Sequence, residues 1–213
     1  MSDHLTINMN ANLTATDRDH LWWLQHSGVR LPVRVHVDLG CGGGGLGRSL
    51  VHRGVEMSVG VDVVTIPQQT ENNEVKGFQF LMLDLNRPDW PEQIRQSIDG
   101  RHADLVTAFD FLEHVDSPWN TLHAVSRVLA PGGRLVITTP NVMSWERILK
   151  PSRWSGAQDP QHKILLHPYS LKFLLERAGY HLEMLRAPLR KLGPLGWNLP
   201  VGGQMIAVAQ RRE

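Results

Sequence analysis

A glycine-rich segment directly follows an apolar stretch that ends in a carboxylate, and it constrains the fold of this chain more than any other feature. The segment is Val37-Asp38-Leu39-Gly40-Cys41-Gly42-Gly43-Gly44-Gly45-Leu46-Gly47. Glycine permits a positive φ and lets a ligand approach the backbone without meeting a Cβ atom. A strand that leads into such a turn is typical of sheets that bind a nucleotide at their carboxyl edge. The segment therefore predicts a ligand-binding turn at the end of a buried strand.

The spacing of the glycines separates several kinds of ligand. Gly40, Gly42 and Gly44 alternate behind Asp38. A dinucleotide turn has the spacing Gly-x-Gly-x-x-Gly, and a phosphate loop ends in Gly-Lys-Ser/Thr. No lysine follows this run, and Asp38 would repel a pyrophosphate. A dinucleotide site and a purely structural turn remain alternatives, because two further glycines permit other registers.

Apolar stretches return at regular intervals along the chain and alternate with helix-like stretches. Strands are predicted at residues 33–39, 57–62, 78–83, 103–109, 134–139, 180–185 and 205–210. Helices are predicted at residues 46–52, 91–98, 119–129 and 169–178. Because strands alternate with helices, the pattern indicates an α/β fold with a mostly parallel sheet and helices on both faces.

Two stretches lie apart from this alternation. Thr16, Asp17 or Asp19 is expected to cap a short helix that follows them, because such side chains accept hydrogen bonds from free first-turn amides. Residues 1–30 are therefore predicted to form an N-terminal helical cap at the edge of the site. Residues 140–166 combine prolines, glycines and two tryptophans without a clear period. This composition favours a substrate-facing insertion.

Three further local predictions complete the outline of the chain. Pro131-Gly132-Gly133 predicts a turn before the fifth strand. Residues 66–77 are largely polar and weakly periodic, so the helix there is expected to be short or absent. Residues 186–203 are rich in proline and glycine and are expected to form a long loop or hairpin. The whole chain, residues 1–213, is predicted to fold as a single domain.

Composition limits the partners and the compartment of the protein. The 213 residues carry a formal net charge of +1, which makes nucleic acid an unlikely partner. Cys41 is the single cysteine, so no intrachain disulfide can form and a reducing compartment is expected. The polar N-terminus is unlike a secretory signal, and no apolar run approaches the roughly 20 residues that cross a bilayer. These features favour a cytoplasmic protein without a membrane partner.

The order of several motifs along the chain shows a family resemblance. Asp38 and the alternate glycines resemble the first motif of class I S-adenosylmethionine-dependent methyltransferases, and residues 104–115 are similar to the fourth. Residues 129–135 resemble the turn before the fifth strand of that family, and residues 169–180 resemble the helix before the sixth. The resemblance implies a Rossmann-like class I methyltransferase fold with strand order 3-2-1-4-5-7-6 and an antiparallel seventh strand.

The same resemblance implies the cofactor S-adenosylmethionine (SAM) and a set of residues that bind it. The glycine turn would hold the methionine portion, and Asp62 would accept hydrogen bonds from both ribose hydroxyls. Asp84 would accept a hydrogen bond from the adenine amino group, beside Leu85. The fourth strand would offer backbone carbonyls near Phe109. The predicted cofactor-binding residues are Asp38, Gly40, Gly42, Gly44, Asp62, Asp84, Leu85 and Phe109.

Carboxylates and an imidazole follow the fourth predicted strand. Asp110, Glu113 and His114 stand at i, i+3 and i+4, on one side of a helical turn. With His162 they are similar to the Glu-x-x-Glu-His element and later histidine of ubiquinone-pathway and small-RNA O-methyltransferases, which hold a divalent ion. Asp110 stands where that family has the longer glutamate. The resemblance implies a metal site of Asp110, Glu113, His114 and His162 for a cation such as Mg²⁺. A metal-free general base at His162 is the alternative.

Three other residues each have two interpretations. His167 can be structural, or it can replace His162 in either role. Trp145 and Trp154 can line a pocket for an aromatic acceptor, or they can cover the sheet.

The sequence thus predicts a SAM-dependent methyltransferase that acts on a small molecule, with a hydroxyl oxygen as the methyl acceptor. An RNA or nucleotide methyltransferase is one alternative, and a SAM-binding module without turnover is another. A nicotinamide oxidoreductase is disfavoured by the glycine spacing. The acceptor's identity and the oligomeric state are not indicated by any motif.

Overall fold

A seven-stranded sheet forms the centre of the computed structural model, which describes residues 13–64 and 75–212. The strands are β1 (Val35–Leu39), β2 (Met57–Asp62), β3 (Phe78–Met82), β4 (Ala103–Phe109), β5 (Leu129–Pro140), β6 (Tyr180–Arg186) and β7 (Gln204–Arg211). They lie in the order β3-β2-β1-β4-β5-β7-β6, and β7 runs antiparallel to both of its neighbours. The remaining pairs are parallel. Both features confirm the predicted fold.

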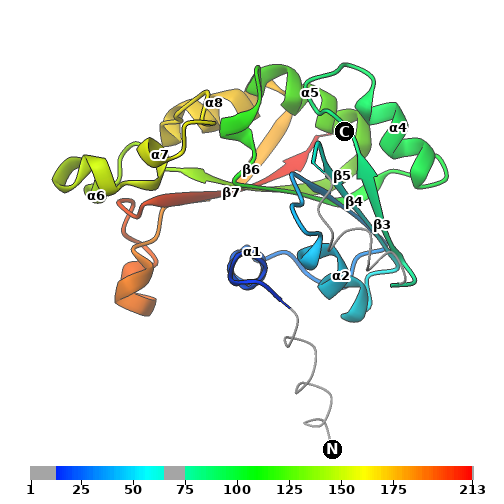
Figure 1. Ribbon diagram of the computed structural model, residues 1–213, viewed down its shortest axis with the longest axis horizontal. Helices are drawn as coiled ribbons and strands as arrows, with labels where there is room; N and C mark the ends of the chain where they lie inside the picture. The colour runs from blue at the N-terminus through cyan, green and yellow to red at the C-terminus, as the bar shows by residue number, and fades with distance from the viewer. Residues whose placement is uncertain (1–12, 65–74, 213) are drawn as a thin grey trace, which may run out of the picture.

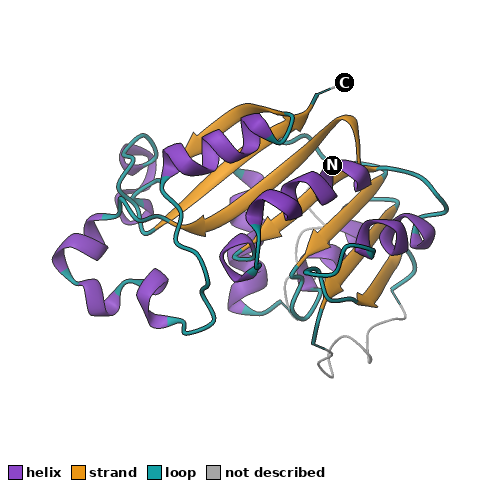
Figure 2. Cartoon of the chain, turned by 90° about the horizontal axis from the view of Figure 1, so that it is seen from above, coloured by secondary structure: helices purple, strands orange, loops and turns teal. Residues whose placement is uncertain are grey.

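Helices cover both faces of the sheet (Figure 1). One face carries α4 (Trp90–Ser97), α5 (Pro118–Val128) and α8 (Pro168–Arg177), and the other carries α1 (Ala15–Gln25) and α2 (Gly45–His52). Figure 2 shows α-helices lying over the sheet and running roughly along its strands. The shorter elements are η1 (Leu112–His114), α6 (Trp145–Leu149), η2 (Pro151–Arg153), α7 (Ser155–Gln158) and η3 (Arg190–Gly196). The result is the three-layer architecture expected of an α/β fold.

Two apolar cores lie on the two faces of the sheet, and the sheet, with β1 among its strands, separates them. Val37 packs with Ile94 of α4 and Leu122 of α5 in the first core. The second core joins α1 and α2 to Phe109 and its neighbours. Because side chains alternate along a strand, His36 and Asp38 of β1 point to the face of the sheet that α1 and α2 cover. Two polar side chains of β1 are thus buried beneath α2.

The first helix begins earlier than predicted. Thr14 is its N-cap: its hydroxyl accepts from the Asp17 amide at 3.1 Å, and the Asp17 carboxylate accepts from the Thr14 amide at 2.9 Å. This reciprocal capping box satisfies two donors at once, so Ala15 can be the first helical residue. The predicted cap at Thr16, Asp17 or Asp19 was wrong. Residues 1–12 of the predicted N-terminal cap lie outside the described residues.

The predicted turn at Pro131-Gly132-Gly133 is part of β5 instead. Helix α5 ends at Val128, and β5 begins at the next residue. The register of β4 against β5 shifts between Ala103 and Leu105, and Gly132 has a φ of 75°. Gly132 therefore belongs to an irregularity inside the strand. Turn-forming residues alone do not distinguish such an irregularity from a separate turn.

The segments after β5 and β6 contact each other at one end of the sheet. The Trp145 amide donates to the Val201 carbonyl at 3.1 Å, and Lys191 lies 3.7 Å from Glu146. The predicted loop at residues 186–203 contains η3. Most of the weakly periodic stretch at residues 66–77 lies outside the described residues. No helix in the described part of the chain is both long and apolar enough to cross a membrane.

Candidate functional site

The glycine turn at the end of β1 forms the base of the site. Gly40, Gly42 and Gly44 all have positive φ, at 72°, 51° and 72°. A Cβ at Gly40 would lie 2.9 Å from the Phe111 ring, whereas a Cβ at Gly42 would meet no atom within 4 Å. Positive φ is costly for residues with a Cβ, so the turn requires glycine even where space is open. The backbone at Gly42 is thus exposed to an approaching ligand.

Asp62, the last residue of β2, holds this turn in place. The Gly42 amide donates to Asp62 Oδ2 at 2.9 Å, and the Val64 amide donates to Oδ1 at 3.2 Å. Both hydrogen bonds run from backbone to a carboxylate, which is a stronger acceptor than a neutral group. Asp62, predicted as a ribose-binding residue, thus also contacts the glycine turn directly.

A cavity of about 670 Å³ opens beside the turn. Four predicted cofactor residues line it: Gly40, Asp62, Asp84 and Leu85. Asp84 is exposed two residues beyond the end of β3, and its Oδ1 accepts from the Asn86 amide at 2.9 Å. The other residues that line the cavity are Val63, Val64, Leu83, Asn86, Asp110, Phe111, His114, Val115, Pro160, Gln161 and Lys163.

The other four predicted cofactor residues, Asp38, Gly42, Gly44 and Phe109, are not among the residues that line this cavity. Asp38 is 2% exposed beneath the glycine turn, where Thr107 donates to its Oδ1 at 2.5 Å. Burial is the main cause that raises the pKa of Asp38 to about 7. The Phe109 side chain packs in the second core, with its ring 5.1 Å from the ring of His20. Any contact of Phe109 with a cofactor would therefore come from its backbone.

A second cavity, of about 510 Å³, adjoins the first. The two share Asp110, His114 and Pro160 as lining residues. The second cavity is also lined by Glu113, Pro140, Gln158, Asp159, His162 and Gln204. A ligand in the first cavity and a ligand in the second would thus meet near Asp110 and His114.

Glu113 is a fully buried carboxylate in the wall of the second cavity. Neither of its carboxylate oxygens has a hydrogen-bond partner among the described residues, and burial, followed by the charge of Asp110, raises its pKa to about 8. Its backbone carbonyl accepts from the amides of Lys163 and Ile164 at 2.8 and 3.2 Å. These bonds tie the segment after β5 to η1 and bring His162 to Glu113.

Glu113, His114 and His162 converge on one point. Each offers one ligand atom, and these atoms lie within 4.8 Å of one another. The imidazole Nδ1 atoms approach backbone carbonyls, that of Gln161 at 3.2 Å from His114 and that of Gly156 at 3.1 Å from His162. Such bonds fix the ring orientation and leave Nε2 as an acceptor or a metal ligand.

Asp110 does not belong to this three-residue group. It has a φ of 48°, and its Oδ1 accepts hydrogen bonds from Thr138 at 3.2 Å and from Gln204. Its other oxygen lies 4.0 Å from His20 Nε2. The structure therefore places Asp110 at the cavity wall with partners of its own, beside the three residues rather than among them.

His167 is the N-cap of α8, and its Nδ1 accepts from the Tyr169 amide at 3.1 Å. This geometry fits its structural interpretation, and the residue does not join the group of Glu113.

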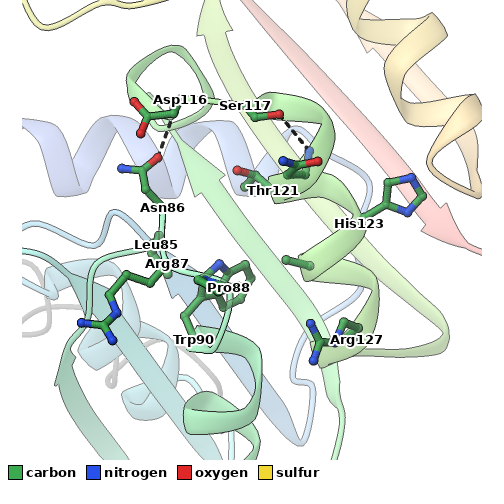
Figure 3. A pocket seen from close by; sticks show the side chains of 12 residues that line it. Leu85, Asn86, Arg87, Pro88, Trp90, Asp116, Ser117, Thr121, His123 and Arg127 are labelled. Atoms are coloured by element: carbon green, nitrogen blue, oxygen red, sulfur yellow. Dashed lines mark hydrogen bonds between the residues drawn. The ribbon is translucent and has the colours of Figure 1, made fainter.

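A further cavity of about 320 Å³ lies between α4 and α5, on the outer side of Leu85 and Asn86 (Figure 3). Its two arginines already have acidic partners: Arg87 lies 3.4 Å from Asp89, and Arg127 pairs with Glu92. Their charges are thus compensated within the protein, and the cavity offers no free cation to an anionic ligand.

Comparison with known families shows the family to which the chain belongs. A family described as a methyltransferase domain matches residues 24–185, which is most of the chain. The chain belongs to this methyltransferase family. Together with the sheet order and the glycine turn, this membership makes it a class I SAM-dependent methyltransferase.

Relatives of this methyltransferase include O-methylating enzymes. A ubiquinone biosynthesis O-methyltransferase of Aeromonas salmonicida is 28% identical over 199 residues, which cover 84% of this chain and 78% of the relative. The fold is similar to that of a SAM-dependent methyltransferase from Archaeoglobus fulgidus, with a TM-score of 0.66, 20% identity and coverage of 92% and 93%. It is also similar to the [4+2]-cyclase SpnF, with a TM-score of 0.62, 18% identity and coverage of 93% and 81%. The last likeness shows that this fold supports other chemistry.

One residue behind the site, next to Asp110, was not indicated by the sequence. His20 of α1 is 9% exposed, faces Asp110 and has no hydrogen-bond partner for Nε2 among the described residues. Burial lowers its pKa. A histidine on an amphipathic helix gives no periodic signal for such a contact, because α1 meets β4 through tertiary packing alone.

Trp145 and Trp154, for which an aromatic acceptor pocket and a cover for the sheet were the two interpretations, lie away from the two adjoining cavities. Trp154 is buried, and its Nε1 donates to the Gly203 carbonyl at 3.4 Å, whereas Trp145 is 40% exposed. Neither is among the residues that line the two adjoining cavities. An aromatic cavity of about 580 Å³ is lined instead by Trp22, His26 and Trp197, with Pro188, Arg190, Gly193 and Pro194.

Proposed function

We propose that this methyltransferase transfers a methyl group from SAM to a hydroxyl oxygen of a small molecule bound in the 510 Å³ cavity. The observation that carries the proposal is the buried Glu113 carboxylate, without a hydrogen-bond partner in the described chain, beside His114 and His162 at the border of the two cavities. A hydroxyl acceptor must lose a proton during methyl transfer, and this group of residues is suited to take it.

The 670 Å³ cavity fits SAM in size and in charge. Asp62 and Asp84 line it, and its one lysine, Lys163, is paired with Asp116 at 2.5 Å. An acidic lining attracts a cationic sulfonium and repels a pyrophosphate. Gly42, two residues beyond the Gly40 that lines the cavity, has an exposed backbone that allows a close approach. When bound, SAM supplies an electrophilic methyl group.

The residues of the chain then have separate tasks. Asp62 and Asp84 orient the ribose and the adenine of the cofactor by accepting hydrogen bonds, and Asp38 faces its methionine portion from beneath the turn. Glu113, whose pKa is raised to about 8, can exist in both protonation states near neutral pH and removes the acceptor proton. His162, 9% exposed at its side chain, helps to position the hydroxyl. Positioning of the two reactants supplies much of the remaining rate enhancement.

A divalent cation is the second candidate for activation of the hydroxyl. The ligand atoms of Glu113, His114 and His162 lie within 4.8 Å of one another, and one carboxylate with two imidazoles suits Zn²⁺, Mn²⁺ or Fe²⁺ better than Mg²⁺. These three residues would hold the ion, which would lower the pKa of a bound hydroxyl. Asp110 is not part of this proposed ligand set.

Two neighbouring cavities extend the proposed acceptor side beyond the catalytic residues. A small cavity of about 110 Å³ contains Gln204, which also lines the 510 Å³ cavity, and Pro188 and Arg190, which also line the aromatic cavity. An acceptor with a hydroxyl group at Glu113 and an apolar part at Trp22 would fit this series of three cavities. Residues 140–166 supply His162 and Pro160 to the acceptor side, which supports the proposal that they face the substrate.

The test measures methyl transfer from SAM to a panel of catechols, phenols and aliphatic alcohols by mass spectrometry. We expect methylation of at least one phenolic acceptor and a loss of about 10²-fold or more in kcat for Glu113→Gln, as for removal of a general base. Glu176→Gln, on the outer side of α8, is the matched control and should keep full activity. Activity lost on chelation and restored by Mn²⁺ or Zn²⁺ would favour the cation over a metal-free base.

Two other functions predict different results when RNA is added to the panel of acceptors. An RNA or nucleotide methyltransferase would label RNA and ignore the phenols. A SAM-binding module without turnover would bind SAM and methylate none of the acceptors. Undiminished phenol methylation in Glu113→Gln would contradict the role given to Glu113.

A further inference from the structure

Four polar side chains form a buried row across three strands beneath α2. Ser58 on β2, His36 and Asp38 on β1 and Thr107 on β4 are each no more than 2% exposed. The strand register places His36 beside Ser58 and Asp38 beside Thr107. Polar groups on a covered sheet face cost free energy unless they are hydrogen-bonded. The row therefore exists only because its members bond to one another.

The hydrogen bonds of this row have one consistent direction when Asp38 is ionised. Thr107 donates its hydroxyl proton to Asp38 Oδ1 at 2.5 Å, because a carboxylate can only accept. Thr107 Oγ1 then accepts from His36 Nε2 at 2.9 Å, and His36 Nδ1 accepts from Ser58 Oγ at 2.8 Å. Complete burial keeps the pKa of His36 low, at about 3, so the ring is neutral. Each proton in the row is thus assigned by the chemistry of its neighbours.

The row ends at a free oxygen under the glycine turn. Asp38 Oδ2 is buried and has no hydrogen-bond partner among the described residues. The charged groups that face Asp38 are acids, Asp17 on α1 and Asp62 at the end of β2, and both disfavour its ionised form. The buried Cys41 thiol also faces Asp38, and burial raises its pKa so that it stays neutral. Arg48 of α2 faces Asp17 and Cys41 instead.

We propose that Ser58, His36 and Thr107 are positioning residues that fix the rotamer of Asp38 and leave Oδ2 for the ammonium group of SAM, so that cofactor binding releases a proton from Asp38. The inference rests on the cofactor site proposed above. A nearby ammonium favours the ionised carboxylate and offsets the two acids. The ammonium keeps its protons, and the proton of Asp38 leaves to solvent.

Calorimetry of S-adenosylhomocysteine binding, which carries the same ammonium group, tests this coupling in the full-length protein. Wild-type affinity should rise as pH increases from about 6 to about 8, by at most ~10-fold per pH unit, because one linked proton has this limiting slope. Titrations in buffers of different ionisation enthalpy should show release of a fraction of one proton near neutral pH. Wild-type binding without proton release and with a flat pH profile would overturn the proposal but leave the cofactor site intact.

Thr107→Val removes the hydroxyl while keeping the shape of the side chain. Because the Thr107 hydrogen bond lowers the pKa of Asp38, its loss should weaken binding near neutral pH and move the pH profile toward alkaline pH. Thr107→Ser should restore the wild-type profile. Thr121→Val, another buried threonine, on α5, is the control and should bind normally. A merely structural role for Thr107 would lower stability without moving the profile, and that result would overturn the relay.

Nitrogen chemical shifts of His36 give a second readout that does not need a variant. With Asp38 ionised, as proposed for the S-adenosylhomocysteine complex, the wild-type ring should show the neutral Nε2–H tautomer, as the row of hydrogen bonds requires. The Nδ1–H tautomer would contradict the assigned direction even if Thr107→Val failed to fold. Absence of any wild-type binding at every pH would overturn the relay and the proposed cofactor site together, unlike a flat profile.

Discussion

At the scale of single residues, Asp62 connects the backbone of the turn to the proposed ligand. Its two carboxylate oxygens accept from the Gly42 and Val64 amides, and the side chain also lines the 670 Å³ cavity. A carboxylate has about four lone-pair positions, so acceptance from two amides leaves capacity for ribose hydroxyls. The same residue can therefore shape the turn and recognise the cofactor.

Asp62→Asn should weaken SAM binding by about 10-fold or more, since hydrogen bonds to charged groups contribute about 1.5–3 kcal/mol each. The amide keeps the size of the side chain, but its NH₂ group cannot accept from a backbone amide. Calorimetry with SAM measures the effect, and Asp89→Asn, an exposed aspartate next to α4, is the control. Unchanged affinity in Asp62→Asn would remove Asp62 from the proposed cofactor site.

At the scale of elements, α1 connects the cofactor turn with the segment between β6 and β7. Asp17 lies so close to α2 that a Cβ on Gly45 would be 2.3 Å from its carboxylate. Two residues later, Asp19 pairs with Arg190, whose guanidinium lies 3.9 Å from the centroid of the Trp22 ring. A single helix thus contacts the glycine turn at one end and η3 through its middle.

Arg190→Ala should lower the stability of the protein by about 1–2 kcal/mol, from the loss of a cation–π contact and a partly exposed ion pair. The melting temperature should fall by about 2–8 °C, since each 1 kcal/mol corresponds to about 2–4 °C for a chain of this size. Lys191→Ala is the matched control, because its side chain is 81% exposed and its ion pair is long, at 3.7 Å. Equal melting temperatures for the two variants would show that the Arg190 contacts do not stabilise α1.

The elements also show where prediction from the sequence reached its limit. Strands such as β1 and β2 were predictable because buried parallel strands carry continuous apolar runs. The start of α1 was not predictable, because Thr14 lies before the capping candidates Thr16, Asp17 and Asp19. The contact of His20 with Asp110 and the approach of His162 to Glu113 depend on tertiary hydrogen bonds, such as Lys163 to the Glu113 carbonyl. Residues that act together across the sheet therefore needed the structure.

At the scale of the whole molecule, buried acids make stability depend on pH. The pKa of Glu113 is raised from 4.5 to about 8, so the folded state keeps a proton that the unfolded chain releases near pH 4.5. Between these values the folded state binds more protons, and its free energy of unfolding falls as pH rises. The stabilising contribution of the protonated carboxyl is complete below pH 4.5 and is lost progressively up to about pH 8.

Glu113→Gln should therefore melt at a higher temperature than the wild type at about pH 8.5, because a neutral amide removes the cost of the buried charge. The two proteins should differ less at about pH 5, where Glu113 is protonated.

Addition of Mn²⁺ or Zn²⁺ at the alkaline pH should raise the wild-type melting temperature and leave Glu113→Gln unchanged if the cation hypothesis holds, since a ligand stabilises the state that binds it. Calorimetric melting in the presence and absence of each ion makes the measurement, with Glu176→Gln as control. A wild-type curve that ignores both ions would leave Glu113 as a metal-free base, and a variant no more stable than wild type at alkaline pH would contradict its burial as a charged group.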